Sequence, residues 1–318
     1  MPGRIRGTNP AKVTKATISK KEHLGGTMND RKIVLSRGTS VMARPGFGIQ
    51  FNTLPHHATV LPLPDTVKPG HVLNTFMSAR IPQQREVLEK TLHYCGFELD
   101  VAAEVLDELL RAGVFHEQLP ATELLVLRTG QSSDKLGRTL HREGVDSTEA
   151  QRARTLIAAA GAETVALLPG SVFLHTDLQF MLMQARVRHY PGAAVDGSII
   201  LGPLVIPGRT PCLNCVDMAY EAQDEQWKSI RLQAAGRPMT ADPTGMEAAA
   251  LTMANLVTTH IIPWQSAGCP EDSIPEILLH RLEYRLAEGK IQQWKPEWNM
   301  ACPSCQMVLT TRITRGSA

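Results

Sequence analysis

Short apolar runs separated by turn residues fill the first third of the chain after a polar start. They predict strands, because glycine, proline, asparagine and serine stand between them. The strands are expected at 32–35, 41–43, 48–51 and 58–61. Apolar residues then recur at helical spacing, so helices are expected at 71–80, 83–94 and 101–111. With a closing strand at 114–115, this order is typical of a winged-helix-like α+β domain over residues 31–117.

The ends of the predicted helices carry local signals. Pro82 precedes the second helix, and Gly96 follows it as a stop. Asp100 is positioned to cap the third helix, which would place Val105 and Leu109 on one face. We therefore expect this helix to begin directly after Asp100.

Strands and helices alternate in the second part of the chain, over residues 122–318. The strands are expected at 124–127, 163–168, 172–175, 187–190, 198–201, 203–206, 277–286 and 291–294. The helices are expected at 135–143, 148–160, 178–185, 220–235 and 244–262. Such alternation is typical of an α/β domain with a parallel sheet. Residues 118–122 are interpreted as a linker between the two domains.

Composition and the N-terminal segment narrow the setting. Hydrophobic residues make up 43% of the 318 residues, which is enough for a packed core. Residues 1–30 are basic and polar and are expected to be disordered; translation from Met1 or from Met28 fits this pattern equally. The most apolar long stretch, 248–264, is broken by polar residues and is too short to span a bilayer. We therefore expect a cytoplasmic protein without membrane attachment.

The chain is nearly neutral, with 33 Lys and Arg residues against 31 Asp and Glu residues. This balance does not point to a polyanionic partner. The predicted third helix carries Glu104, Asp107 and Glu108 against Arg111 alone. Because an acidic recognition helix repels phosphate, no nucleic-acid partner is expected, and a winged-helix DNA-binding regulator is a disfavoured alternative.

Four of the six cysteines form two Cys-x-x-Cys pairs, Cys212 with Cys215 and Cys302 with Cys305. Two residues between thiolates allow a tight turn that aims both sulfurs at one ion, and four thiolates complete a tetrahedral Zn²⁺ site. We predict one shared structural zinc, which joins segments more than eighty residues apart and leaves no open position for catalysis. A redox-active Cys-x-x-Cys at either position is the alternative.

The first strand and helix of the second domain enclose a degenerate nucleotide turn. Only Gly130 and Gly137 stand in this segment, too far apart for a Gly-x-Gly-x-x-Gly motif. Arg128 and Gln131 occupy positions where small residues would let the backbone approach phosphate. We also find no strand that ends in Asp or Glu at the spacing of a ribose contact. We therefore predict that this strand–helix unit remains as part of the scaffold and does not bind ATP. A functional nucleotide-binding site is the alternative.

Residues 201–217 have the sequence LGPLVIPGRTPCLNCVD. This segment resembles the one that carries the first zinc knuckle in ThiF-like partner proteins of YcaO cyclodehydratases, from azoline biosynthesis in thiazole/oxazole-modified microcin systems. Residues 224–227, DEQW, resemble a short acidic stretch with a tryptophan in that family, and residues 302–305 resemble its second knuckle. The elements over 31–117 are similar to the family's RiPP recognition element. The resemblance covers nearly all of the chain after residue 30.

The resemblance implies a degenerate ThiF-like, Rossmann-type α/β domain with a structural zinc behind the winged-helix-like domain. It implies a non-catalytic subunit that binds the leader peptide of a ribosomally synthesised precursor and presents it to a separate YcaO-type cyclodehydratase. In the family, the leader adds as a strand beside the third helix. The matching positions here are Thr59, Val60, Leu61, Val101, Glu104, Val105 and Glu108. A homodimer through the α/β domain is also implied.

The sequence departs from the adenylating members of the ThiF-like group. Between residues 143 and 171 the pattern leaves room for one helix and one strand, so a strand–helix portion is expected to be missing. Asp177 and Arg186 are either remnants of an adenylation site or surface residues. We therefore expect no catalysis, and an adenylyltransferase that activates a peptide or carrier-protein C-terminus is the alternative.

Overall fold

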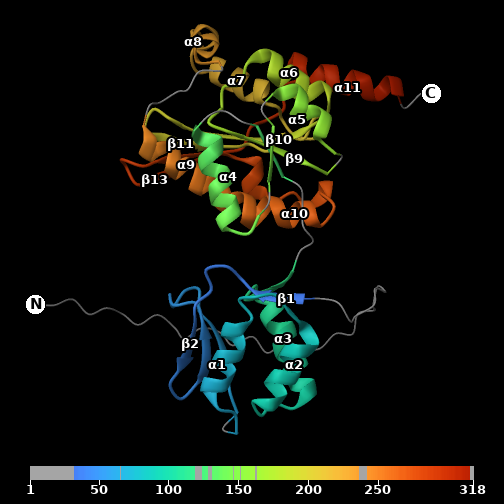
Figure 1. Cartoon of the computed structure of the whole chain (residues 1–318). Coiled ribbons are helices and arrows are strands. Elements are labelled where there is room, and N and C mark those ends of the chain that lie inside the picture. The colour runs from blue at the N-terminus through green and yellow to red at the C-terminus, as the bar shows by residue number, and fades with distance from the viewer. Residues whose placement is uncertain are drawn as a thin grey trace, which may run out of the picture. The chain divides into compact units, whose positions relative to one another are not determined.

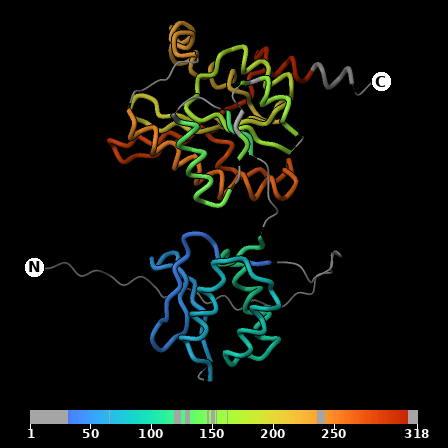
Figure 2. The backbone as a smooth tube through the Cα atoms, in the orientation of Figure 1, coloured from blue at the N-terminus to red at the C-terminus, as the bar shows by residue number. Residues whose placement is uncertain are grey.

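The computed structural model describes residues 32–64, 66–118, 124–127, 131–145, 147–150, 152–161, 163–235 and 242–315. The expected disordered segment 1–30, with both candidate start methionines, lies outside these residues, as does most of the expected linker. The chain divides into two compact units, Met1–Gln118 and Leu119–Ala318, named unit 1 and unit 2 below. Figures 1 and 2 trace the backbone through both units from blue to red.

Unit 1 contains two small antiparallel sheets. Their strands are β1 (Lys32–Leu35), β2 (Val41–Arg44), β3 (Gly48–Phe51), β4 (Thr59–Pro62), β5 (Gln83–Gln84) and β6 (Phe115–Glu117). One sheet has the order β5-β1-β6 and the other β2-β3-β4, so β4 is an edge strand. The register of β3 and β4 pairs Ile49 with Leu61 and Phe51 with Thr59. The four strands predicted at the start of this region are confirmed.

The described part of unit 1 also contains three helices, α1 (Pro69–Ser78), α2 (Arg85–Tyr94) and α3 (Leu99–Arg111). The predicted cap of α3 is wrong, because Glu98 is the residue at the N-cap position. Asp100 instead lies in the first turn, where its Oδ1 accepts a 2.9 Å hydrogen bond from the Val101 amide. A carboxylate is favourable there as well, since the amino end of a helix carries a partial positive charge.

Three buried aromatic rings form the centre of the core of unit 1. Phe51 comes from β3, Phe76 from α1 and Phe115 from β6, and none is more than 1% exposed. The ring centroids are 5.3 Å apart for Phe51 and Phe76, and 5.7 Å apart for Phe76 and Phe115. Aromatic rings bury large apolar areas and favour such tilted contacts. They therefore join the sheets to α1 within one core.

Unit 2 is built on one mixed sheet. Its strands are β7 (Leu124–Leu127), β8 (Ser147–Ala150), β9 (Val165–Pro169), β10 (Arg188–Val195), β11 (Ser198–Leu201), β12 (Arg281–Arg285) and β13 (Lys290–Trp294). Their order is β13-β12-β11-β10-β9-β7-β8. The four strands β8, β7, β9 and β10 run parallel, and the other three are added antiparallel. The predicted α/β class is therefore confirmed, whereas the sheet is mixed and not wholly parallel as expected, because β11, β12 and β13 extend it as antiparallel hairpin strands.

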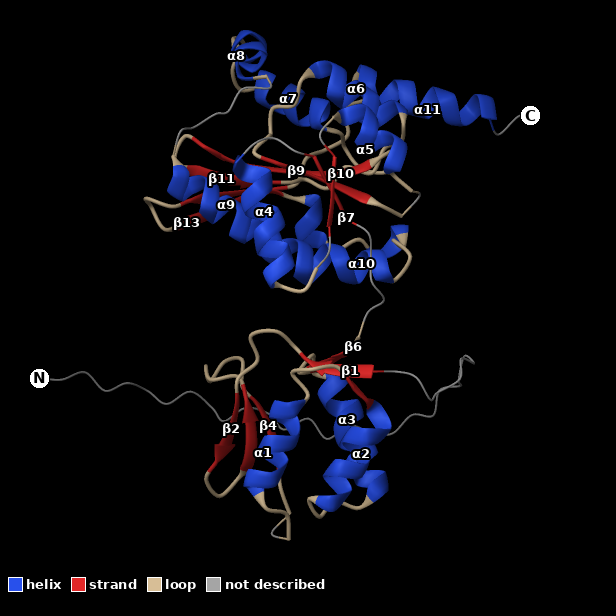
Figure 3. Ribbon diagram, viewed as in Figure 1, coloured by secondary structure: helices blue, strands red, loops and turns tan. Residues whose placement is uncertain are grey.

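Helices cover both faces of this sheet. They are α4 (Gln131–Arg142), α5 (Ala153–Ala159), α6 (Thr176–Gln184), α7 (Leu213–Glu221), α8 (Trp227–Ala234), α9 (Pro243–Leu256), α10 (Ile262–Ser266) and α11 (Pro303–Arg315). Figure 3 shows α4, α9 and α10 on one face and α5, α6, α7 and α11 on the other. No helix among the described residues is both long enough and apolar enough to cross a bilayer.

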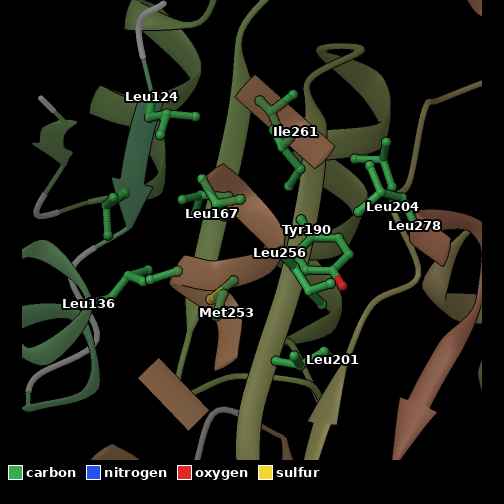
Figure 4. Close-up of a cluster of buried hydrophobic side chains, with 14 of the residues drawn as sticks. Leu124, Leu136, Leu167, Tyr190, Leu201, Leu204, Met253, Leu256, Ile261 and Leu278 are labelled. Carbon is green, nitrogen blue, oxygen red and sulfur yellow. The ribbon is translucent and has the colours of Figure 1, made fainter. Parts of the chain in front are cut away.

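The apolar run of β7 explains the two layers. Leu124 and Val126 face the cluster that contains Leu136 of α4 and Met253 of α9, which Figure 4 shows in close-up. Leu125 and Leu127 belong to the opposite cluster, with α5, α6, α7 and α11. Because side chains alternate along a strand, a strand buried on both faces is apolar throughout.

The helix predicted at 148–160 is wrong in its first half. Residues 147–150 form β8 instead, with Thr148 opposite Leu125 of β7, and α5 begins only at Ala153. Backbone pairing at the open edge of the sheet outweighs the weak helix propensity of this segment. The described residues between 143 and 171 therefore form two strands and one helix, so the expectation of only one strand is also wrong.

Smaller corrections concern loops and helix boundaries. Two predicted strands, 172–175 and 203–206, are loops. An isolated bridge joins Ser171, beside the first loop, to Gly192, and another joins Val205, in the second loop, to His189. The helix predicted at 220–235 is divided between α7 and α8, and a 3₁₀ turn precedes β12. The C-terminal helix α11 was not predicted.

Candidate metal centre and peptide-binding face

The two cysteine pairs meet in unit 2. The Sγ atoms of all four residues lie within 4.8 Å of one another. The Sγ–Sγ distances are 3.9 Å for Cys212–Cys215, 3.5 Å for Cys212–Cys302, 3.6 Å for Cys215–Cys305 and 3.4 Å for Cys212–Cys305. All four side chains are buried. The fold thus brings together the pairs that the sequence places far apart.

These distances fit a four-coordinate metal ion and not a disulfide. Zn–S bonds of about 2.3 Å in a tetrahedron place the sulfurs about 3.8 Å apart. A disulfide needs an S–S distance of about 2.05 Å, and all six cysteines are free thiols. Four sulfur donors favour a soft or borderline ion such as Zn²⁺ and leave no coordination position open. The residues present therefore fit the expected closed site.

Each pair begins a helix, which explains how its two sulfurs come to the same side. Cys212 is the N-cap residue of α7, and Cys302 directly precedes α11. The Cys215 amide donates to the Cys212 carbonyl at 3.0 Å, and the Gln306 amide donates to the Cys302 carbonyl at 3.0 Å. The first helical turn therefore fixes the spacing of each pair, and the positive end of the helix favours thiolates.

Hydrogen bonds inside the cluster shift the pKa values of its thiols in opposite directions. The pKa of Cys302 is lowered because other thiols hydrogen-bond to its thiolate; Cys212 has the largest effect and Cys215 the next largest. The Asn214 side-chain amide also donates to the Cys302 Sγ at 3.3 Å. The hydrogen bond between Cys212 and Cys215 raises the pKa of Cys212 in turn. A bound cation would remove this competition, because metal binding releases the thiol protons.

The proposed remnants of an adenylation site do not come together here. Asp177 is exposed in the first turn of α6. Arg186 follows α6 with a φ of 56°, and its guanidinium donates to the Val308 carbonyl of α11 at 3.1 Å. Asp177 is therefore a surface residue, and Arg186 fastens the helix that follows Cys302.

The predicted peptide-binding positions lie on β4 and α3 of unit 1. Among the described residues, β3 is the one strand that pairs with β4, so the other edge of β4 has no strand beside it. Thr59 and Val60 are half-buried, whereas Leu61 belongs to the core. Among the described residues, one edge of β4 therefore has no paired strand, and the peptide-binding role of these positions stays a prediction.

On α3 the predicted positions separate by exposure. Val101 is 37% exposed, and Glu104 and Glu108 are exposed on the same helix. Val105 is only 8% exposed and packs in the buried cluster that also contains Leu61. The side chains of Val105 and Leu61 therefore support the surface from within and offer little of it themselves.

One exposed acid of α3 is already paired with α2. Arg85 of α2 donates to Asp107 at 2.6 Å and to Glu89 at 2.7 Å. The pKa of Arg85 is raised, chiefly by the hydrogen bond with Asp107. The pair holds α3 against α2, while the described contacts of Glu104 and Glu108 include no ion pair. The acidic face of α3 expected from the sequence is therefore present.

The carboxyl end of β7 is where a nucleotide would bind in this topology, since the strand order reverses between β7 and β9. Residues 128–130, with Arg128 and Gly130, lie outside the described residues. Behind them, Lys135 of α4 forms an ion pair with Glu247 of α9, which lowers the pKa of Glu247. This ion pair joins α4 to α9, and the ammonium group of Lys135 is engaged in it.

A buried ion pair and an aromatic cluster lie around the segments 201–217 and 224–227. The sequence analysis predicted neither of them. The Nε of Arg231 in α8 donates to both carboxylate oxygens of Asp217, at 3.0 Å and 2.9 Å. Burial raises the pKa of Asp217, against the opposing effect of Arg231. Trp227 packs on Tyr220 and Phe173, with centroid distances of 4.7 Å and 5.6 Å. The tryptophan in the segment DEQW, residues 224–227, was the one sequence feature that could have indicated this aromatic cluster.

Comparisons with known proteins point to one fold. No protein-family model and no curated protein matches the chain. A solved heterocyclase in complex with substrate and cofactor is similar at a TM-score of 0.59 and 12% identity, over 89% of this chain and 41% of that chain. The heterocyclase TruD is similar at a TM-score of 0.52 and 13% identity, over 86% of this chain and 43% of that chain. E. coli MccB, solved with AMPCPP and MccA, is similar at a TM-score of 0.50 and 13% identity, over 86% of this chain and 99% of that chain.

These similarities concern the fold, because the identities are far below those that indicate shared activity. The chain spans less than half the length of the two heterocyclase chains it matches. The similarity extends over residues of both units, since 86% or more of this chain is covered.

Proposed function

We propose that this protein is a recognition subunit without catalytic activity of its own, which binds the leader peptide of a ribosomally synthesised precursor and presents it to a YcaO-type cyclodehydratase. The observation that supports the proposal is the fold similarity to heterocyclase chains, which covers 89% and 86% of this chain. In this proposal the chain supplies recognition, and a separate YcaO-type protein supplies the ring-forming chemistry.

The open edge of β4 supports peptide binding in unit 1. A peptide that adds as a strand gains main-chain hydrogen bonds from such an edge and specificity from neighbouring side chains. Val60 on β4 and Val101 on α3 would contact apolar side chains of the leader. Glu104 and Glu108 would favour a leader with basic residues at the facing positions. In this proposal unit 1 acts as the winged-helix-like recognition element.

We further propose that Cys212, Cys215, Cys302 and Cys305 hold a structural Zn²⁺ in the cytoplasm, where thiols stay reduced. The ion would supply no catalysis, because four sulfurs fill its coordination sphere. It would join α7 to α11 and thereby complete one layer of unit 2. Assembly into a homodimer through unit 2 also belongs to this proposal, and light scattering on the purified chain measures it.

Reconstitution of ring formation tests the function. The precursor and cyclodehydratase encoded beside this gene are incubated with ATP, with and without the chain, and the precursor is analysed by mass spectrometry. The proposal expects loss of one water per ring only when the chain and the leader are both present. Equal modification without the chain contradicts it.

A second candidate is an adenylyltransferase, favoured by the similarity to MccB, which was solved with AMPCPP and is covered over 99% of its chain. Exchange of pyrophosphate into ATP in the presence of peptide substrates separates the two candidates. Exchange above the rate of a heat-inactivated sample supports the enzyme. DNA binding stays disfavoured, because Glu104, Asp107 and Glu108 are exposed on α3.

A further inference from the structure

Unit 2 contains an apolar groove of about 400 Å³ that the proposed peptide-binding face does not use. Its lining comes from three connecting segments, which lie within residues 203–211 after β11, 274–279 before β12 and 295–298 after β13. All three segments adjoin the antiparallel strands of the sheet. A nucleotide in this topology would bind at the carboxyl end of β7, so the groove is a separate place.

Proline, aliphatic and aromatic side chains make up most of the lining. Its apolar members include Pro203, Pro211, Ile274, Leu279, Pro296 and Trp298. Ile274 and Leu279 are half-buried, and Trp298 is 37% exposed. The volume lies within the range of ligand pockets, which is about 300–1,000 Å³. Because apolar surface gains free energy when it is removed from water, the lining favours an apolar occupant.

The groove is rigid before any occupant arrives. The Thr210 Oγ1 accepts a 2.7 Å hydrogen bond from the Ile206 amide and donates to the Leu204 carbonyl at 3.0 Å. The Leu204 amide donates to the Leu278 carbonyl at 2.7 Å, which joins the first wall to the second. The prolines of the lining have a fixed φ as well. Less conformational entropy is therefore lost on binding.

Both cationic side chains of the lining already have a carboxylate partner. Lys295 forms an ion pair of 2.9 Å with Glu276, which joins the third wall to the second. Arg209 forms an ion pair of 2.5 Å with Glu271. Because these charges are neutralised within the chain, the lining does not select an anion.

Glu297 is the remaining charged residue of the lining, and it is exposed. Its described contacts include no hydrogen bond and no ion pair. With each cation counted together with its partner, the described lining carries the single negative charge of Glu297. Trp298 is the next residue, and an indole ring attracts cations as well. The groove therefore complements an apolar group that lies close to a positive charge.

We propose that this groove docks an extended segment of a partner protein, in which a large apolar side chain stands two residues from a lysine or an arginine. Side chains two positions apart lie on the same side of an extended chain. The apolar side chain packs against Pro211, Pro296 and Trp298, and the cation pairs with Glu297. The proposal does not depend on leader recognition, because none of the predicted peptide-binding residues lines the groove.

NMR of the full chain tests this site, because the indole groups of its four tryptophans give separate signals. The signal that is missing in Trp298→Phe belongs to Trp298. The chain is titrated at low ionic strength with acetyl-Phe-Ala-Arg-amide and with acetyl-Phe-Ala-Glu-amide. We expect the first peptide to shift the Trp298 signal saturably. The second should bind about threefold more weakly or less tightly still, because Glu297 repels its carboxylate.

Glu297→Gln is expected to remove most of this difference between the two peptides, since the variant has no charge to discriminate between them. Glu225→Gln is the matched control, because Glu225 is exposed and lies outside the groove. The control should keep the preference of the wild-type chain. Thermal unfolding of each variant shows that it is folded.

Each outcome supports or overturns the proposal. A saturable shift of the Trp298 signal, with a preference for the arginine peptide that only Glu297→Gln removes, supports it. A Trp298 signal that stays unchanged up to about 10 mM of the arginine peptide overturns it. Equal affinities for the two peptides, or an unchanged preference in Glu297→Gln, overturn it as well. Binding of acetyl-Ala-Ala-Arg-amide as tightly as the phenylalanine peptide contradicts the apolar contact.

Discussion

The Sγ atoms of Cys212 and Cys302 lie 3.5 Å apart, although ninety positions separate the two residues in the chain. This contact joins the start of α7 to the start of α11 and closes a long loop over the sheet of unit 2. The loop-closure entropy of such a segment is large, so an ion at this point stabilises the fold by restricting the unfolded chain.

Removal of one sulfur should therefore cost both metal and stability. In Cys302→Ser we expect bound zinc to fall from one ion per chain to less than half. The free energy of unfolding should fall by about 4 kcal/mol or more, since the remaining thiols lose their common ion. Zinc content and denaturant unfolding measure both effects. Cys95→Ser, at a half-buried position of unit 1, is the matched control and should change neither. A metal-free Cys302→Ser variant of unchanged stability contradicts the structural role.

Val101 provides the sharpest single test of the peptide-binding face. Val101→Asp places a charge on the exposed side of α3, where an apolar leader side chain is proposed to pack, so leader affinity should fall tenfold or more. Val87→Asp is the control, because Val87 is 46% exposed on α2. Fluorescence anisotropy with a labelled leader peptide compares them. Equal affinities of the two folded variants would show that the leader binds elsewhere.

Asp217 and Arg231 form a pair whose side chains are only 12% and 11% exposed. Asp217→Ala leaves the Arg231 guanidinium without its carboxylate, so we expect a loss of about 3 kcal/mol in the free energy of unfolding. The pair Lys228–Glu221, at 3.4 Å and with side chains 76% and 29% exposed, is the control. Lys228→Ala should cost less than about 1 kcal/mol. A double-variant cycle on each pair checks the contrast, and equal coupling energies would refute it.

His189 should give unit 2 a measurable sensitivity to acid. It is fully buried, its Nδ1 donates to the Val187 carbonyl at 2.9 Å, and burial lowers its pKa to about 4. The unfolded chain binds a proton below about pH 6.5 while the folded chain does not, so stability present above pH 6.5 is lost as the pH falls towards 4.

His189→Asn keeps a side-chain donor and removes this titration. Between pH 7 and pH 5 the wild-type chain should lose about 2 kcal/mol more of its free energy of unfolding than the variant does. Urea unfolding at both pH values measures the difference. Parallel losses in the two proteins would mean that other groups cause the acid sensitivity.

Local patterns predicted the elements with strong internal signals. The apolar run at β7 and the cysteine spacing both specify their structure within a few residues. The segment of β8 carries no such signal, because only the edge of β7 makes it a strand. Pro303 is a helix-start residue that marks α11, yet the short polar segment after it lacks apolar periodicity.

Long-range pairs were beyond sequence reasoning for a physical reason. Arg231 meets Asp217 across two helices, and Arg186 meets α11 across 122 positions. Such partners are set by packing of whole elements, which no local window contains. The positions proposed for peptide binding illustrate the same limit, since the pattern did not separate the exposed Val101 from the buried Val105.

Calorimetric titration of the leader peptide into the folded, zinc-loaded chain tests the central claim most directly. The peptide is the leader of the precursor encoded beside the gene, with a scrambled peptide of the same composition as control. We predict saturable binding of one leader per chain, and none of the scrambled peptide. No heat from the leader, or equal heat from the scrambled peptide, would contradict the account.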